Sequence, residues 1–451
     1  MAAEDALAAK KRRLCTGGGG EDMMSALPEH VLQEVLSRVG TVKDLFKLAA
    51  TCRRWLGRFT DRAFLREILC PVKAQGLLGF FLQDACQGVR MAWTRKDAAQ
   101  QLASACSFLP APGSPLGPGP TARALTSSLV ADGRGAFDYA VPLAARRGIV
   151  LMQRVPCRLD SHLLLGVCNP VTGQRNLLEP LHYGDPTKMR GYAIITAADA
   201  DAAGGFTFSQ LLVATVDTTD RRAVHLYSYS AATRSWSAPT LCLANGRGFC
   251  PAKGQRSAVV HQGAAHWLWL YRDTGGQRAG DDDLYKLSVQ LGGGGAAAGP
   301  IRFAFTRIPV RGGGNPLLCV TGDSELAVVC TYIWHVAVST CHQQQQAGGG
   351  HAAESWERTA FTIPAAVPYP DTPPLWQPIE KWFHLSRGSM LVLYRSSAVF
   401  VVDLHSKTVE KVMDCFLHLF ADQLNRTAVP YEMDLVDFFM SKLGGLSFIA
   451  L

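Results

Sequence analysis

Three consecutive carboxylates are the densest group of side chains in this sequence that could do chemistry. Asp281, Asp282 and Asp283 could together attract a divalent cation, which prefers oxygen ligands. However, consecutive side chains of an extended chain point to opposite sides, and no further acidic ligands follow at the spacing of a calcium-binding loop. We therefore interpret this segment as a solvated turn.

Histidine and cysteine side chains offer weaker candidates for metal binding or nucleophilic catalysis. His261 and His266 flank a strand-like segment, and their spacing of five residues places them on opposite faces of a single strand. Cys341 and His342 are adjacent but lack a second pair of ligands. Cys52 lies in an apolar helical segment, so we interpret it as a small hydrophobic residue rather than a nucleophile.

The motifs of common enzymes do not occur in a supporting context. We find no GxSxG, HExxH, GxGxxG, or GxxxxGK followed by Ser or Thr. The 13 cysteines are odd in number and never form CxxC, which argues against a zinc ribbon, a thioredoxin-like site and a disulfide framework. We expect no metal and no cofactor, and these residues identify no catalytic site.

The composition is that of a folded protein with a modest positive charge. Of the 451 residues, 48% are hydrophobic, which excludes wholesale disorder. The net charge of +8 permits an acidic partner but is too diffuse for a nucleic-acid binder. The charged start lacks a signal-peptide core, and no apolar stretch is long enough to span a membrane. We expect a soluble protein with reduced thiols, in the cytoplasm, the nucleus or both.

The first 69 residues divide into a tail and a helical block. Residues 1–22 predict a disordered tail, in which Lys10–Arg13 is either a nuclear localisation signal or a solvated charge run. Residues 23–69 predict three helices, the third around Trp55. The apolar stripes of the first two helices are Val31, Leu32, Val35, Leu36 and Val39, then Leu45, Leu48, Ala49 and Cys52.

This helical block carries more large apolar side chains than it can bury alone. A unit of its size is marginally stable, yet it contains Trp55, Phe59 and Phe64. Some of these side chains are therefore expected to face a partner or the next domain. The alternative is an ordinary helical extension that packs on the rest of the chain.

From residue 70 to residue 430 the pattern changes to that of short β-strands. Apolar runs rich in β-branched and aromatic residues alternate with clusters of Gly, Pro, Asp or Asn, which is typical of an all-β domain. The main expected strands are Leu77–Leu82, Gly148–Met152, Leu163–Cys168, Leu211–Val216, Val224–Tyr229, Ala265–Tyr271, Leu326–Tyr332, Met390–Tyr394 and Ala398–Leu404.

A weak internal repeat refines this prediction. Similar turns begin at Asn169, Ser230 and Asp403, and Ser288 begins a degenerate copy, so successive intervals are 61, 58 and 115 residues. The last interval is about two units, which places a further copy near residue 345. We expect an α+β multidomain chain with an antiparallel β-propeller of six to eight blades, or alternatively a pair of β-sandwiches. Residues 431–451 predict a short closing helix against the β domain and a tail.

Two segments of the helical block resemble the F-box. Leu27–Arg38 has its opening Leu-Pro and first helix, and Leu45–Trp55 has its closing Cys-Arg-Arg-Trp at the expected distance. The sequence departs from the commonest pattern at His30 and at Gly40-Thr41, which leaves the apolar stripe intact. Phe64-Leu65 after Asp61 is also usual just past such a motif.

The F-box resemblance implies a substrate receptor of an SCF-type ubiquitin ligase. F-box helices bind a Skp-family adaptor, which links them to a cullin and a RING protein, and the receptor itself is not catalytic. Trp55 is expected to be the main anchor, because a buried indole often dominates such interfaces. The adaptor-binding residues that the resemblance implies are Leu27, Pro28, Val31, Leu32, Val35, Leu36, Leu45, Leu48, Cys52 and Trp55.

The β domain resembles the F-box-associated domain of plant proteins, particularly those of grasses. Tyr229 and Trp236 are spaced as in a kelch blade, although the double Gly expected before them is displaced. The resemblance implies that this domain binds a target protein through residues that the sequence does not identify. Two alternatives remain: an F-box scaffold outside ubiquitination, or a propeller with sugar-binding or enzymatic activity. The other segments that carry the resemblance are Val167–Gly173, Ser257–Val260, His266–Leu268 and Pro430–Leu435.

Overall fold

The computed structural model of the chain describes most of the helical block and the strands of the β domain. Leu27, Cys52, the tail 1–22 with its basic cluster, and the tail after residue 443 lie outside the described residues. The described residues are 28–39, 42–49, 51, 53–69, 77–84, 107–111, 114, 137, 140–154, 162–182, 190–200, 207–216, 223–244, 249–252, 255–271, 282–291, 301–312, 315–321, 323–331, 335–344, 353–362, 382–384, 390–395, 398–414 and 426–443.

The described N-terminal residues form four helices rather than the three expected. Pro28 is the N-cap of the first, and its carbonyl accepts the N–H groups of Val31 and Leu32 at 3.0 and 3.2 Å. The unexpected fourth helix begins after Asp61, whose Oδ1 accepts the N–H group of Ala63 at 2.8 Å, as an N-cap side chain does. The helices are α2 (Glu29–Ser37), α3 (Val42–Ala49), α4 (Arg53–Phe59) and α5 (Arg62–Leu69).

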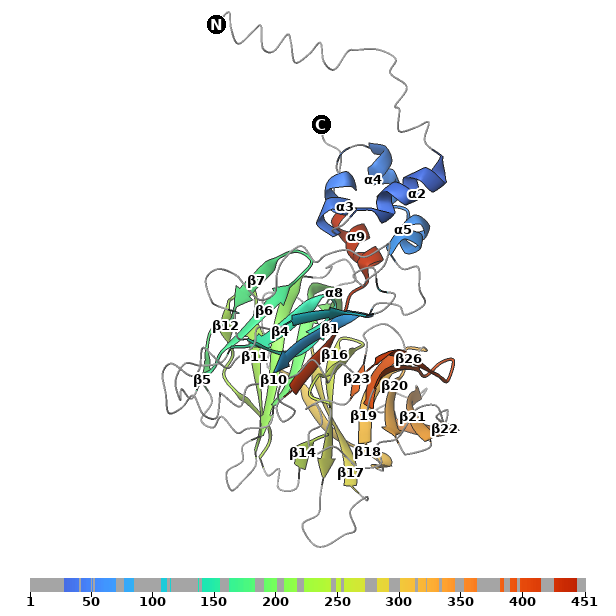
Figure 1. The fold of residues 1–451 in the computed structure, drawn as a ribbon. Coiled ribbons are helices and arrows are strands. Elements are labelled where there is room, and N and C mark those ends of the chain that lie inside the picture. Colours follow the sequence, from blue (N-terminus) through green and yellow to red (C-terminus); the bar gives the residue numbers. More distant parts are fainter. Residues whose placement is uncertain are drawn as a thin grey trace, which may run out of the picture.

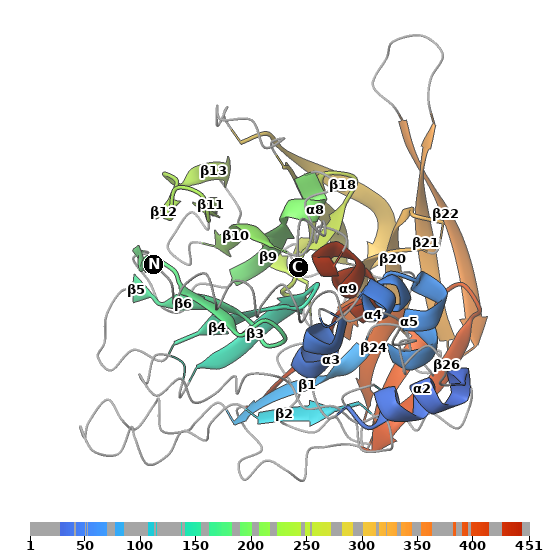
Figure 2. The ribbon, with the colours of Figure 1, turned by 90° about the horizontal axis from the view of Figure 1, so that it is seen from above.

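Five antiparallel sheets of four or five strands follow one another around a ring, which is the arrangement of a β-propeller (Figure 2). All nine expected strands are present within them or in the sheet that closes the ring. The first blade is β3 (Val141–Arg146), β4 (Ile149–Gln153), β6 (Leu165–Asn169) and β7 (Gln174–Leu177); the second is β9 (Arg190–Thr196), β10 (Phe208–Val216), β11 (Val224–Ser230), β12 (Ser235–Trp236) and β13 (Thr240–Leu243). The third blade is β14 (Phe249–Pro251), β15 (Val259–His261), β16 (Ala264–Tyr271), β17 (Asp282–Gln290) and β18 (Phe303–Gly312). The fourth blade is β19 (Asn315–Val320), β20 (Leu326–Thr331), β21 (His335–Gln344) and β22 (Ala353–Thr362). The fifth blade is β23 (Trp382–His384), β24 (Met390–Arg395), β25 (Ala398–Asp403) and β26 (Thr408–Asp414).

In the part of the chain that the structure describes, five full blades replace the expected six to eight. A further sheet has only three strands in the order β2-β1-β27, and it joins the two ends of the β domain: β1 (Leu77–Asp84) and β2 (Ser107–Pro110) come from its start and β27 (Arg426–Glu432) from its end. Phe80 and Pro430 face each other in this pairing. A separate two-stranded pair consists of β5 (His162–Leu163) and β8 (Leu181–His182).

The turn that marks the repeat joins the third and fourth strands of a blade. In the first blade, Asn169 Oδ1 accepts the N–H groups of Val171 and Thr172 at 3.0 and 3.2 Å. Gly173, four residues after Asn169, has a φ of +75°, which glycine adopts without steric cost. A polar side chain at the first position and a left-handed residue at the fifth therefore reverse the chain.

The same geometry explains why the second and fifth blades carry related sequences. Asp403 Oδ1 accepts the N–H group of His405 at 2.8 Å, and Lys407 has a φ of +56°. In the second blade, Arg234 stands at the corresponding position after Ser230, with a φ of +54°. The degenerate copy differs: Ser288 lies inside β17, opposite Ala304, rather than at the turn.

The C-terminal helix α9 (Leu435–Leu443) packs on the N-terminal helices, which corrects the expectation that it would pack on the β domain. The Phe439 ring stacks on the Phe59 ring with centroids 5.9 Å apart. Arg62 and Asp437 form an ion pair at 2.9 Å. Figure 1 shows α9 among α3, α4 and α5 at one end of the molecule, although the two ends of the chain are far apart in sequence.

One apolar core continues from the helices into the β domain. It includes Leu36, Trp55 and Phe59 of the helices together with Phe81 of β1 and Val171 of the first blade. Because hydrophobic burial is roughly proportional to the apolar area removed from water, this shared core stabilises the helices and the β domain as one unit.

Candidate functional site

The described residues that the F-box resemblance implies for adaptor binding lie partly in the core and partly at the surface. Leu32, Leu36 and Leu45 are buried, while Leu48 is half-buried. Trp55 is only 5% exposed, and its ring lies 6.0 Å from the ring of Phe59, measured between centroids. The predicted anchor therefore belongs to the core of the chain itself, where it holds α4 against the other helices.

The apolar side chains that do reach the surface lie mainly along one face of α2. Pro28 is exposed, Val31 is half-buried and Val35 is 43% exposed. Their spacing of three and four residues places them in a row on a helix. An ion pair between Arg38 and Glu34, at 2.7 Å, lies on the same helix. This row is a small apolar surface with charged neighbours, as in a helix that binds another protein.

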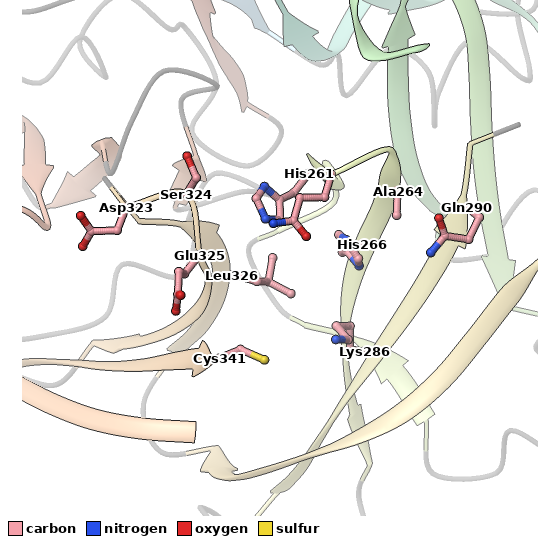
Figure 3. Close-up of a pocket in the computed structure, with 11 residues that line it drawn as sticks. His261, Ala264, His266, Lys286, Gln290, Asp323, Ser324, Glu325, Leu326 and Cys341 are labelled. Atoms are coloured by element: carbon pink, nitrogen blue, oxygen red, sulfur yellow. The ribbon is translucent and has the colours of Figure 1, made fainter. Parts of the chain in front are cut away.

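A second candidate site is a polar cleft between the third and fourth blades. Its volume is about 310 Å³. The third blade contributes the hairpin between β15 and β16 and the middle of β17, and the fourth blade contributes the turn before β20. Figure 3 shows the side chains that line the cleft, which are His261, Gln262, Ala264, His266, Lys286, Gln290, Asp323, Ser324, Glu325, Leu326 and Cys341.

The two histidines of the cleft are not placed as the sequence predicted. His261 ends β15 and His266 lies on β16, because Gln262 and Gly263, with φ of +46° and +70°, reverse the chain between them. Both imidazoles therefore line the same cavity (Figure 3). The prediction of a single strand with the histidines on opposite faces is wrong at this position.

Burial keeps one of these histidines neutral. Desolvation, followed by the positive charge of Lys286, lowers the pKa of His266 to about 4. His266 Nδ1 also lies 2.8 Å from Ser288 Oγ. At neutral pH the positive charge on this wall of the cleft therefore comes from Lys286.

The remaining candidates for chemistry have structural partners. Asp283 lies in β17 rather than in the expected solvated turn, and it accepts a hydrogen bond from Arg307 at 2.7 Å. His342 Nδ1 lies 2.6 Å from Glu325 Oε2. Burial raises the pKa of Cys168 to about 12 and that of Cys242 to about 11, so neither supplies a thiolate near neutral pH.

Searches for larger sites gave two negative results over the described part of the chain. No group of three or more His, Cys, Asp or Glu side chains there is placed to hold a metal ion. No helix among those same residues is both long enough and apolar enough to cross a membrane.

Comparison with protein families identifies the helical region. Residues 24–70, which contain α2 to α5, match the family model described as F-box-like. Residues 24–70 are an F-box-like domain. The matched residues contain the exposed row on α2. No curated protein is similar enough to match the chain.

Several solved structures show a distant likeness to this chain. An α-L-arabinofuranosidase of Fusarium graminearum is 9% identical with a TM-score of 0.32, covering 66% of this chain and 82% of its own. A protein of Listeria monocytogenes is 6% identical with a TM-score of 0.29, covering 67% and 92%. A quinoprotein alcohol dehydrogenase-like protein of Bacteroides thetaiotaomicron is 9% identical with a TM-score of 0.24, covering 60% and 80%. Such low similarity carries no inference about activity.

Sequence reasoning found the F-box-like domain but missed the cleft. Lys286, Ser288 and Gln290 alternate with apolar residues along β17, a pattern that normally indicates a solvent-facing side of a strand. Only the packing of the third blade against the fourth places this face inside the molecule. No local signal in the sequence distinguishes the two situations.

Proposed function

We propose that this protein is the substrate-recognition subunit of an SCF-type ubiquitin ligase. The F-box-like domain would bind a Skp-family adaptor, which brings a cullin and a RING protein, while the β domain binds the target. The observation that carries this proposal is an exposed apolar row within the F-box-like domain itself, on α2. The receptor acts by holding the target near a separate transfer enzyme, and it needs no catalytic residue.

The geometry narrows which residues would contact the adaptor. Side chains already enclosed in the core, such as Leu36 and Trp55, support the helices from within. Pro28, Val31 and Val35 are left to form the contact, with Leu48 at its edge. Apolar groups at the centre of an interface contribute most of the binding energy when surrounding groups exclude water.

The finer features of the sequence resemblance belong to the same proposal. The likeness to plant, and particularly grass, F-box-associated domains and to kelch blades rests on short segments such as Val167–Gly173. One contact fits a kelch-type blade: Tyr229 and Trp236 face each other across β11 and β12, with ring centroids 5.2 Å apart. A place in the cytoplasm, the nucleus or both would give the receptor access to the adaptor.

Adaptor capture by two matched variants tests the proposal. Val35→Glu is expected to weaken binding of the co-expressed adaptor by about tenfold or more, because it places a charge in an apolar contact. Leu177→Glu is the control, since Leu177 on β7 is similarly exposed, at 49%, but lies outside the F-box-like domain. Equal capture of the adaptor by both variants would contradict the proposed surface.

A second measurement separates a ubiquitin-ligase receptor from an F-box scaffold. If the chain recruits a target for degradation, proteasome inhibition raises the amount of target recovered with the wild-type chain and not with Val35→Glu. Recovery of adaptor and cullin without any such dependence on the proteasome would favour the scaffold.

A further inference from the structure

The cleft between the third and fourth blades interrupts an otherwise apolar interface. Leu268 and Leu270 of β16, with Leu284 of β17, pack against Leu318 and Val328 of the fourth blade. Apolar packing of this kind is the usual way in which neighbouring sheets bury their faces. The interruption is therefore a local feature that the packing of the blades does not require.

The polar residues of the cleft stand on the same face as these leucines. In the pairing of β16 with β17, His266 lies opposite Ser288, and Leu268 lies opposite Lys286. Side chains two residues apart point to the same side of a strand, so His266 and Lys286 continue the face that carries Leu268. The interface thus changes from apolar to polar toward the hairpin between β15 and β16.

Opposite charges line opposite sides of this cleft. Lys286 lies on the side of the third blade beside the neutral His266, and Asp323 and Glu325 lie across from it on the fourth (Figure 3). Glu325 Oε2 also lies 2.6 Å from His342 Nδ1. The Lys286 residue is only 6% exposed. Burial of an ammonium group is costly unless negative groups compensate for its lost hydration. The cleft therefore has a positive wall at Lys286 and a negative wall at Asp323 and Glu325.

The volume and charges select a class of ligand. A cleft of about 310 Å³ lies at the small end of ligand pockets, which hold roughly 300–1,000 Å³, and it is large enough for one or two amino-acid side chains. A polyanion such as a nucleic acid would be repelled by Asp323 and Glu325. An apolar group would remove water from the exposed carboxylate of Asp323 without replacing it. A ligand with a carboxylate and a neighbouring cation is complementary in charge to both walls.

We propose that the inter-blade cleft binds a segment of the target protein that carries an acidic and a basic side chain close together. The carboxylate lies toward Lys286 and His266, and the cationic group lies toward Asp323 and Glu325. This inference rests on the proposed function, since it names the chemistry of the target that the β domain would recognise. The competing possibility is that the cleft holds only water.

Peptide binding to the full chain, co-purified with its adaptor, tests this proposal. The probe is an array of capped nonapeptides with varied flanks around a Glu-Gly-Lys centre, compared with Gln-Gly-Lys and Glu-Gly-Gln. We expect about tenfold tighter binding of Glu-Gly-Lys, because each exchange removes one charge-assisted contact. Equal binding of the three sets would overturn the proposal.

Variants of the cleft show which wall binds the acidic side chain of the peptide and which wall binds the basic one. Lys286→Met is expected to abolish the preference for Glu over Gln, and Glu325→Gln is expected to abolish the preference for Lys over Gln. Arg307→Met is the matched control, because it removes an exposed positive charge from the same blade, on β18. Loss of the Glu preference in the Arg307 variant to the same extent would also overturn the proposal.

Two further comparisons keep the outcome unambiguous. Lys286→Arg keeps the charge and is expected to retain the Glu preference, which distinguishes loss of charge from loss of fold in Lys286→Met. Binding of N-acetylglutamate as tight as that of the peptides would assign the site to a small carboxylate instead and overturn the peptide assignment. Val35→Glu is expected to bind the peptides normally, so failure of adaptor capture and failure of the cleft are separate results.

Discussion

Asp199 is the residue that most directly ties one blade to the next. Arg146, at the end of β3 in the first blade, donates two hydrogen bonds to its carboxylate at 2.6 and 2.7 Å. The same guanidinium donates to the Ile194 carbonyl of β9 at 3.0 Å, and Arg147 lies 3.1 Å from the carboxylate. Thr196 adds its own N–H group at 2.8 Å. Asp199 is thus a buried negative charge with several donors supplied by two blades.

The pH dependence of stability is expected to report this contact. Burial by itself raises the pKa of Asp199, but the hydrogen bonds and charge of Arg146, with Arg147 and Thr196, lower it overall. The stabilisation is then complete above the unfolded pKa of about 3.9 and is lost as the pH falls through the lower folded value. Asp199→Asn is expected to lower the free energy of unfolding by about 3–5 kcal/mol at pH 7, measured by urea denaturation.

The contribution of Asp199 is expected to begin to shrink as the pH falls below about 4, and wild type and Asp199→Asn converge as the pH falls through the lower folded pKa of Asp199. Asp283→Asn provides the control because Asp283 forms an exposed ion pair with Arg307. Solvent screens such a pair, so its removal is expected to change stability far less than the removal of the Asp199 carboxylate. A constant difference between wild type and Asp199→Asn from pH 7 to pH 3 would show that the carboxylate charge is not the source of the stabilisation.

Single elements were predictable from sequence where local chemistry decides them. The nine expected strands follow apolar runs and lie close to β1, β4, β6, β10, β11, β16, β20, β24 and β25. The repeated turns follow a polar first residue and were also predicted close to their observed positions. The sequence did not predict helix α5. Its N-cap residue, Asp61, lies past the closing Trp55 of the F-box motif, where no further helix was expected. The partner of α9 could not be predicted, because it depends on where the chain returns after the whole propeller.

The repeated turn provides a prediction at the scale of one element. Gly173 and Lys407 stand at corresponding positions, with φ of +75° and +56°. Gly173→Ala is expected to lower the free energy of unfolding by about 1 kcal/mol, because a side chain is unfavourable in left-handed backbone. Lys407→Gly is expected to raise it by about 0.5 kcal/mol for the same reason. Urea denaturation measures both, and a destabilised Lys407→Gly variant would contradict this explanation of the repeat.

At the scale of the molecule, the turn repeat agrees with the blades of the described residues better than the expected six to eight blades do. Its positions at 169, 230, 288, near 345 and at 403 each fall near the junction of a third and a fourth strand, once per blade, which gives five. The sheet formed by β1, β2 and β27 joins segments from the two ends of the β domain rather than repeating a local unit.

The sheet formed by β2, β1 and β27 also fixes the position of the F-box-like domain relative to the propeller. Strand β27 pairs with β1 and leads directly into α9, and α9 contributes Phe439 to the core of the N-terminal helices. On the other side, Tyr431 Oη donates to the Gly148 carbonyl of the first blade at 3.2 Å. The helices are therefore held by both ends of the β domain, so a bound adaptor would have a set position relative to the cleft.

Phe439→Ala tests this attachment for the whole molecule. Removing a fully buried ring stacked on Phe59 is expected to cost about 3–5 kcal/mol. The loss of stability is expected to be confined to the helices. Amide hydrogen exchange therefore accelerates in α2 to α5, while β16 and β20 stay protected. Phe303→Ala on β18 is the matched control, since that ring is 38% exposed. If exchange in the helices is unchanged, α9 is dispensable and the N-terminal helices are held by β1 alone.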